Sequence, residues 1–67
     1  MNNNPQIESK NLTNLGDLMN QEALAYSKAK SYSPQLTDAN AKNIIEQVQN
    51  HHKQSFMALD SYLQSHN

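Results

Sequence analysis

The stretch SYSPQLTD (residues 31–38) decides the fold, because it separates two long helical patterns. Pro34 cannot continue the helix before it, and it biases Ser33 toward an extended conformation. The same proline can open the next helix with Ser33 as N-cap, while Thr37 and Asp38 are competing caps if that helix starts later. Two long helices joined by so short a turn must lie antiparallel. The sequence therefore predicts an all-α two-helix hairpin.

The predicted helices span about residues 12–32 and about residues 36–64, with the turn at 33–35. In each, apolar side chains recur at helical spacing and form a stripe. The first stripe comprises Leu12, Leu15, Leu18, Met19, Ala25, Tyr26, Ala29 and Tyr32. The second comprises Ala41, Ile44, Ile45, Val48, His52, Ser55, Phe56, Leu59, Tyr62 and Leu63. The residues expected to pack the core, or the interface of a dimer, are Leu15, Met19, Ile45, Val48, Leu59 and Tyr62.

The composition limits the class of protein. A chain of 67 residues allows one small domain, and residues 1–11, which lack periodicity, are expected to be disordered. The chain has no cysteine, which excludes disulfides and thiolate metal sites. Its lysines are scattered and it has no arginine, so nucleic-acid binding is not expected. No apolar run suits a signal peptide or a bilayer span, so we expect cytoplasmic synthesis and no membrane contact.

The small size predicts self-association. A chain this short buries little apolar surface, and a lone hairpin leaves one side of each stripe in water. Two hairpins that form a four-helix bundle would cover it, so a homodimer is the predicted state. Leu24, opposite the first stripe, is a further apolar contact point.

One acidic and one basic residue interrupt the stripes. Glu22 falls at the centre of the first stripe and His52 at the centre of the second, and counting from the turn places Glu22 opposite residues 48–52. A buried carboxylate is costly unless it is paired or coordinated. We therefore expect Glu22 and His52 to approach each other, with Tyr26 as a second hydrogen-bonding candidate and His51 at the edge of the same face. Three interpretations stay open: a structural hydrogen bond, a metal site shared by two copies, or a solvated Glu22.

A family resemblance covers about residues 12–63. The layout LGDLMNQEALAYSKAKSYSPQLTDANAKNIIEQVQNHHKQSFMALDSYL resembles the spore coat protein F family of spore-forming Firmicutes. Besides a leucine-rich start, the residues that carry it are Glu22, Tyr26, Pro34, His52, Phe56 and Tyr62. The glycine- and aromatic-rich C-terminus frequent in that family is missing. The resemblance implies a ferritin-like bundle, a role in the coat or another layer of the spore, and other coat proteins as partners.

The wider ferritin-like group binds two metals with glutamates from two helices and a Glu-x-x-His motif from the other two. By this resemblance Glu22 matches the lone glutamate and His52 matches the motif histidine, but Gln49 stands where the motif needs glutamate. Two copies would then supply two carboxylates and two imidazoles. Such a degenerate set would hold Zn²⁺ or one Fe²⁺ only loosely.

Three functions follow from these observations. The leading prediction is a structural or assembly protein of the spore coat, a role that the resemblance implies. It is expected to be non-catalytic, since no Ser–His–Asp set, Cys–His set or glycine-rich phosphate loop is recognisable. The alternative is a degenerate ferritin-like metal-binding protein that uses Glu22 and His52 across a dimer. A third is an adaptor whose hairpin docks another protein's helices, with Leu24 in the contact surface.

Overall fold

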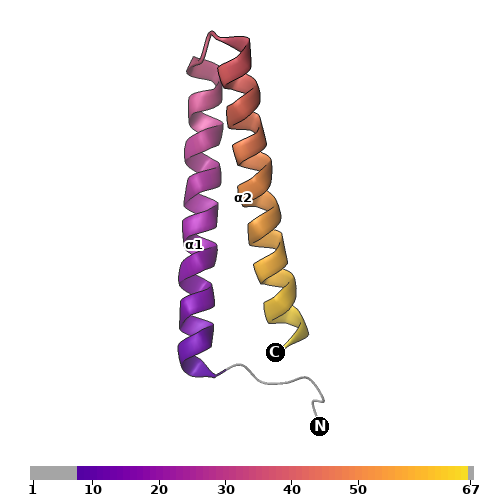
Figure 1. Cartoon of the computed structure of the whole chain (residues 1–67). Coiled ribbons are helices and arrows are strands. Elements are labelled where there is room, and N and C mark those ends of the chain that lie inside the picture. Colours follow the sequence, from indigo (N-terminus) through magenta and orange to yellow (C-terminus); the bar gives the residue numbers. More distant parts are fainter. Residues whose placement is uncertain (1–7, 67) are drawn as a thin grey trace.

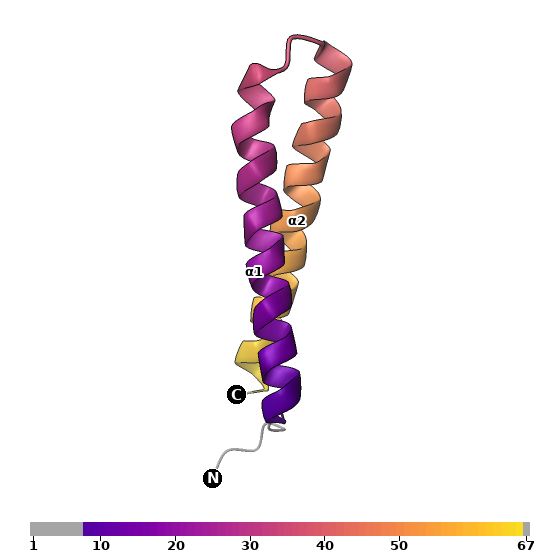
Figure 2. The same ribbon diagram turned by 90° about the vertical axis from the view of Figure 1, so that its left-hand side faces the viewer.

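The computed structural model describes residues 8–66, which form two long helices joined by a short turn (Figure 1). Helix α1 spans Ser9–Tyr32, the 3-10 turn η1 spans Ser33–Gln35, and helix α2 spans Ala39–Ser65. The helices run antiparallel and cross at a shallow angle, as the two side views show together (Figures 1 and 2). The predicted all-α hairpin is confirmed. The disorder predicted for residues 1–7 concerns a segment outside the described part of the chain.

Helix α1 starts earlier than predicted. Its first residue is Ser9, so residues 9–11 belong to the helix rather than to a disordered segment. Glu8 is the N-cap, and the backbone N–H of Leu12 donates to its carbonyl at 2.9 Å. Thr13 lies inside the helix, where its hydroxyl donates to the Ser9 carbonyl at 3.0 Å. Polar residues thus extend the helix beyond its apolar stripe, which is why the stripe alone misplaced the boundary.

The turn differs from the prediction in one respect. Ser33 has right-handed helical dihedrals (φ −52°, ψ −46°) and ends α1, although Pro34 follows it. Pro34 lies in the first turn of η1, where its missing N–H costs nothing because the first turn of a helix leaves such groups unpaired. The chain becomes extended only at Leu36 (φ −83°, ψ 136°), whose N–H donates to the Ser33 carbonyl at 3.3 Å.

Asp38 is the cap of α2, one of the three candidates that the sequence offers. Its Oδ1 accepts hydrogen bonds from the backbone N–H groups of Asn40 (2.7 Å) and Ala41 (3.2 Å). An N-cap of this kind contributes about 1 kcal/mol. The helix therefore starts at Ala39, three residues beyond the predicted boundary.

Few side chains are buried between the two helices of the hairpin. Within residues 8–66 only Ala29, near the turn, is buried, at 5% exposure. The half-buried apolar side chains that meet across the helices are Leu15, Met19, Ala25, Tyr26, Ala41, Ile45, Phe56, Leu59 and Leu63. The outer parts of the predicted stripes face water: Val48 is 36% exposed and Tyr62 is 46% exposed. Each stripe is wider than one neighbouring helix can cover, so a single hairpin buries only one edge of it.

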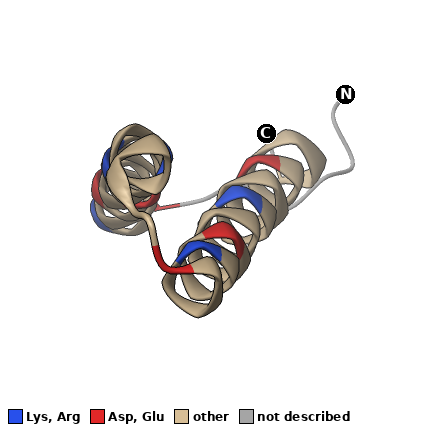
Figure 3. Ribbon diagram, turned by 90° about the horizontal axis from the view of Figure 1, so that it is seen from above, with Lys and Arg blue, Asp and Glu red and all other residues tan. Residues whose placement is uncertain are grey.

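The charged residues of α2 mix both signs. Lys42, Glu46, Lys53 and Asp60 follow one another along this helix, as the end-on view shows (Figure 3). No run of a single sign appears along α2. Neither α1 nor α2 contains a stretch long and apolar enough to cross a membrane.

Candidate functional site

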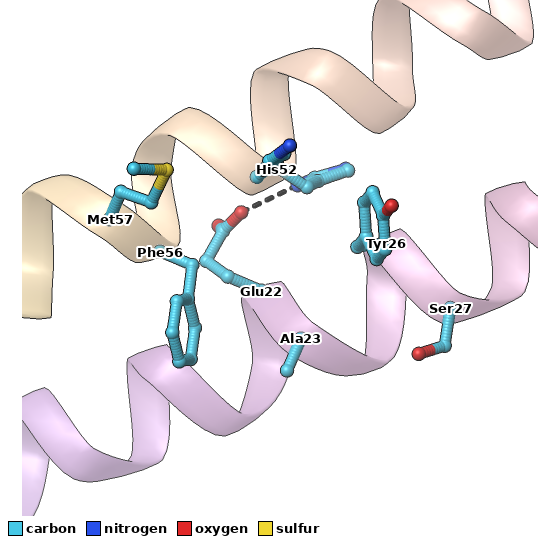
Figure 4. A pocket seen from close by; sticks show the side chains of 8 residues that line it. Glu22, Ala23, Tyr26, Ser27, His52, Phe56 and Met57 are labelled. Atoms are coloured by element: carbon cyan, nitrogen blue, oxygen red, sulfur yellow. Dashed lines mark hydrogen bonds and ion pairs between the residues drawn. The ribbon is translucent and has the colours of Figure 1, made fainter.

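A hydrogen bond joins the two helices at the centre of their interface (Figure 4). Nδ1 of His52 on α2 lies 2.6 Å from Oε2 of Glu22 on α1, and each side chain is 24% exposed. An ionised carboxylate only accepts hydrogen bonds, so the imidazole Nδ1–H is the donor. The structure thus brings together the two residues that counting from the turn places opposite each other.

The pair fixes how the helices slide and rotate against each other. A shift of one residue along α2 rotates a side chain by about 100° around the helix axis, which would carry His52 out of reach of Glu22. Hydrogen bonds to charged groups are among the stronger ones in proteins, and they depend on geometry. Because both groups still touch solvent, the desolvation cost is partial. The pair therefore selects one register at little cost in stability.

The separation of the two atoms is that of a hydrogen bond. Two ligands of one tetrahedral Zn²⁺, each about 2.1 Å from the ion, would lie about 3.4 Å apart. The observed 2.6 Å is the spacing of a charge-assisted hydrogen bond. Within residues 8–66, no group of three or more His, Asp or Glu side chains is placed to hold an ion. Metal binding by Glu22 and His52 would therefore require their separation to increase and further ligands to join them.

The other candidate residues do not join this pair. Tyr26 is half-buried, and the Nζ of Lys30 lies 5.9 Å from the centre of its ring, within cation–π range. His51 is exposed, and its ring meets that of His52 edge-on with 5.4 Å between centroids. Gln49, at the position where the ferritin-like motif needs glutamate, is half-buried, but its amide brings no negative charge.

One contact escaped the sequence analysis. His66 is half-buried, and its ring stacks on that of Tyr62 with 3.9 Å between centroids. Its Nδ1 also lies 2.8 Å from the Tyr62 carbonyl oxygen. The signal was present in the sequence, since residues four apart are neighbours on a helix surface. This stacking orders the aromatic ring near the end of α2.

A shallow groove of about 340 Å³ opens beside the central pair (Figure 4). The residues that line it include Glu22, Ala23, Tyr26, His52, Phe56 and Met57. Most of its wall is apolar, and the carboxylate and the imidazole in it are hydrogen-bonded to each other. With Nδ1 bonded to Glu22, only Nε2 of His52 could act as a base, and among residues 8–66 no hydroxyl is hydrogen-bonded to it.

No family model matches the chain, and neither the curated proteins nor the solved structures contain a match. The similarity to the spore coat protein F family therefore stays a prediction that rests on the residues quoted above.

Proposed function

We propose that this chain is a non-catalytic assembly protein that acts as a dimer of hairpins in the coat or another layer of a bacterial spore. The assembly role is carried by one observation: large apolar side chains are exposed in a row along one side of the hairpin. The spore setting is supported by the family resemblance alone. The non-catalytic character is supported by the surroundings of His52, since among residues 8–66 no serine or threonine hydroxyl is hydrogen-bonded to its ring.

The exposed row has the spacing of a helix–helix seam. On α2, steps of four and three residues alternate, which is the repeat of coiled-coil packing. We define the apolar face as Leu18, Ala25, Tyr32, Ile44, Val48, His51, Ser55, Ala58 and Tyr62. Helical geometry places all of them on one side of the hairpin. A groove that Asn14 of α1 shares with Ala58 and Tyr62 of α2 joins the two helices on that side.

The apolar face differs from the other side of the hairpin in charge and in exposed area. On α2 the face contains no lysine, aspartate or glutamate, since Lys42, Glu46 and Lys53 lie elsewhere on that helix, whereas on α1 the same spacing brings Lys28 beside it. Its five large members are 36–59% exposed, which leaves about 500 Å² of their surface in water if each fully exposed side chain presents about 150–250 Å². The smaller members add to this. A standard interface buries about 800 Å² per partner, so these five side chains alone would supply more than half of the area that a second copy covers.

Folding should therefore depend on protein concentration. Only the folded chain dimerises, so a higher protein concentration stabilises the folded state. The thermal unfolding midpoint should therefore rise by several degrees between about 5 μM and about 500 μM protein. Circular dichroism would follow the unfolding, and sedimentation equilibrium should give twice the chain mass of 7.6 kDa. A folded monomer with the same midpoint at every concentration would contradict the proposed assembly. Poor folding that another protein's helices rescue would favour the adaptor.

The spore setting has a separate test. In a spore-forming source organism, an antibody against the protein should detect it in the extracted coat fraction of purified spores. Vegetative cells serve as the matched sample. Detection in vegetative cells with none in spores would contradict the proposed location, and it would leave the self-association untouched.

A further inference from the structure

We infer that the second copy docks on the apolar face in antiparallel orientation, about a two-fold axis perpendicular to the helices at the level of Glu22 and His52. This arrangement rests on the proposed self-association and adds the orientation of the partner. It places the partner's Ile44 in a groove at the open end of the hairpin, and reciprocally.

The groove and the side chain that fills it lie at opposite ends of the apolar face. The groove has a volume of about 440 Å³, and Leu15 and Leu59 line it together with Asn14 and Tyr62. Near the turn, Ile44 is 59% exposed, although it is strongly apolar. Two copies related by a perpendicular axis place each Ile44 over the other copy's groove. An interface between identical copies must be self-complementary, and these two features meet that requirement.

The order of residues along α2 sets the level of the axis. From the turn to the open end, the face presents two apolar residues, two polar ones and two apolar ones. Antiparallel pairing of α2 with the partner's α2 therefore matches like with like. The predicted pairs are Ile44 with the partner's Tyr62, Val48 with the partner's Ala58, and His51 with the partner's Ser55. The centre of this pattern falls beside His52.

Helix α1 gives the same level independently. Leu18 and Ala25, its apolar members nearest the middle, are equally distant from a point between residues 21 and 22. The hydrogen bond between Glu22 and His52 fixes that point beside the centre of the α2 pattern. A single axis therefore satisfies both helices, with Leu18 opposite the partner's Ala25.

The other symmetric arrangement leaves the groove unfilled. An axis parallel to the helices would bring both turns to the same end and both open ends together. Each groove would then face the other groove, beside the partner's Asn11 and Asn14, with no apolar side chain to fill it. Unfilled apolar space destabilises a packed interface. The perpendicular axis avoids this, because it places a groove opposite a projecting isoleucine.

A distance measurement distinguishes the two arrangements. The chain has no cysteine, so Thr37→Cys, in the exposed connection beside the turn, provides a single site for a nitroxide spin label. Each label would lie about 15 residues from the axis level, so a rise of about 1.5 Å per residue gives roughly 45 Å between labels in an antiparallel dimer. Pulsed electron–electron double resonance on the full chain should show this distance. A dominant distance below about 25 Å, the span of two adjacent helices, would overturn the antiparallel arrangement alone.

Disulfide trapping gives a second readout. A mixture of Ile44→Cys and Tyr62→Cys chains should form mixed dimers more readily than either variant forms a disulfide with itself. A mixture of Ile44→Cys and Tyr32→Cys is the matched control, since those positions meet only if the axis is parallel to the helices. Preferential trapping in the control mixture would overturn the inference. A wild-type monomer in sedimentation would overturn the proposed self-association and this arrangement together.

Discussion

Ile44→Lys should abolish dimerisation at concentrations where the wild-type protein is a folded dimer. The change places an ammonium group in an apolar contact, and an unpaired buried charge costs several kcal/mol. It also removes an isoleucine that is 59% exposed in the hairpin and covered in the proposed dimer. Both copies carry the substitution, so the effect acts twice per dimer. We expect the dissociation constant to rise at least about 30-fold, which corresponds to an interface hot spot of ~2 kcal/mol or more.

The substitution has matched controls in the same chain. Met57 lies on the same helix with 57% exposure but on the opposite side of α2 from the apolar face. Lysine is at least as good a helix former as isoleucine or methionine, so neither change should weaken α2 itself. Met57→Lys should therefore leave the sedimentation behaviour of the dimer unchanged. Equal losses in both variants would contradict the apolar face as the interface.

Leu24→Lys tests an exposed leucine on the outer side of α1, which is 57% exposed. It should also leave the dimer intact, since Leu24 lies outside the apolar face. If it disrupted association while Ile44→Lys did not, the contact surface would be the one that the sequence suggests around Leu24.

The topology was predictable because few residues control it. When a short connection with a proline joins two periodic segments, the compact arrangement of the two helices is an antiparallel hairpin. The start of α2 was not predictable to the residue. Ser33, Thr37 and Asp38 are all acceptable caps, their differences are below about 1 kcal/mol, and the choice depends on the backbone path of the turn.

The helical pattern of one segment does not determine which edge of its stripe faces the other helix. Val48 and Ile45 both belong to the second stripe, but only Ile45 is half-buried against α1. Which edge of a stripe faces its neighbour depends on the rotation of one helix relative to the other. That rotation comes from packing, including the close approach at buried Ala29, and no periodicity within one segment contains it.

The position of Glu22 opposite His52 could be counted from the turn, because a short connection between antiparallel helices fixes their register. The chemistry of the pair could not be predicted in the same way. A hydrogen bond and a shared metal ion require the same residues, and they differ by less than about 1 Å in the separation of the two atoms. The N–O distance of 2.6 Å in this structure is that of the hydrogen bond.

Replacing the members of this pair one at a time should destabilise the fold, and replacing both should not. Glu22→Leu leaves the imidazole of His52 half-buried without its acceptor, and His52→Leu strands the carboxylate, so each should lower the free energy of unfolding by about 1–2 kcal/mol. The double variant removes both polar groups from a site that is 24% exposed on each side. It should recover wild-type stability or exceed it, because apolar replacement of an ion pair is often neutral or stabilising.

The double variant should hold the two helices in a less uniform register even where its stability rises. Polar contacts in helical interfaces specify register, so without the pair the spin-label distances at Thr37→Cys should broaden although the melting temperature is unchanged or higher. Denaturation at one fixed protein concentration supplies the stability values, since the midpoint depends on concentration. Additive losses in the double variant would show that the two side chains act independently. A rise in midpoint with added Zn²⁺, present in the wild type and absent in His52→Leu, would instead assign the pair to metal binding and restore the ferritin-like alternative.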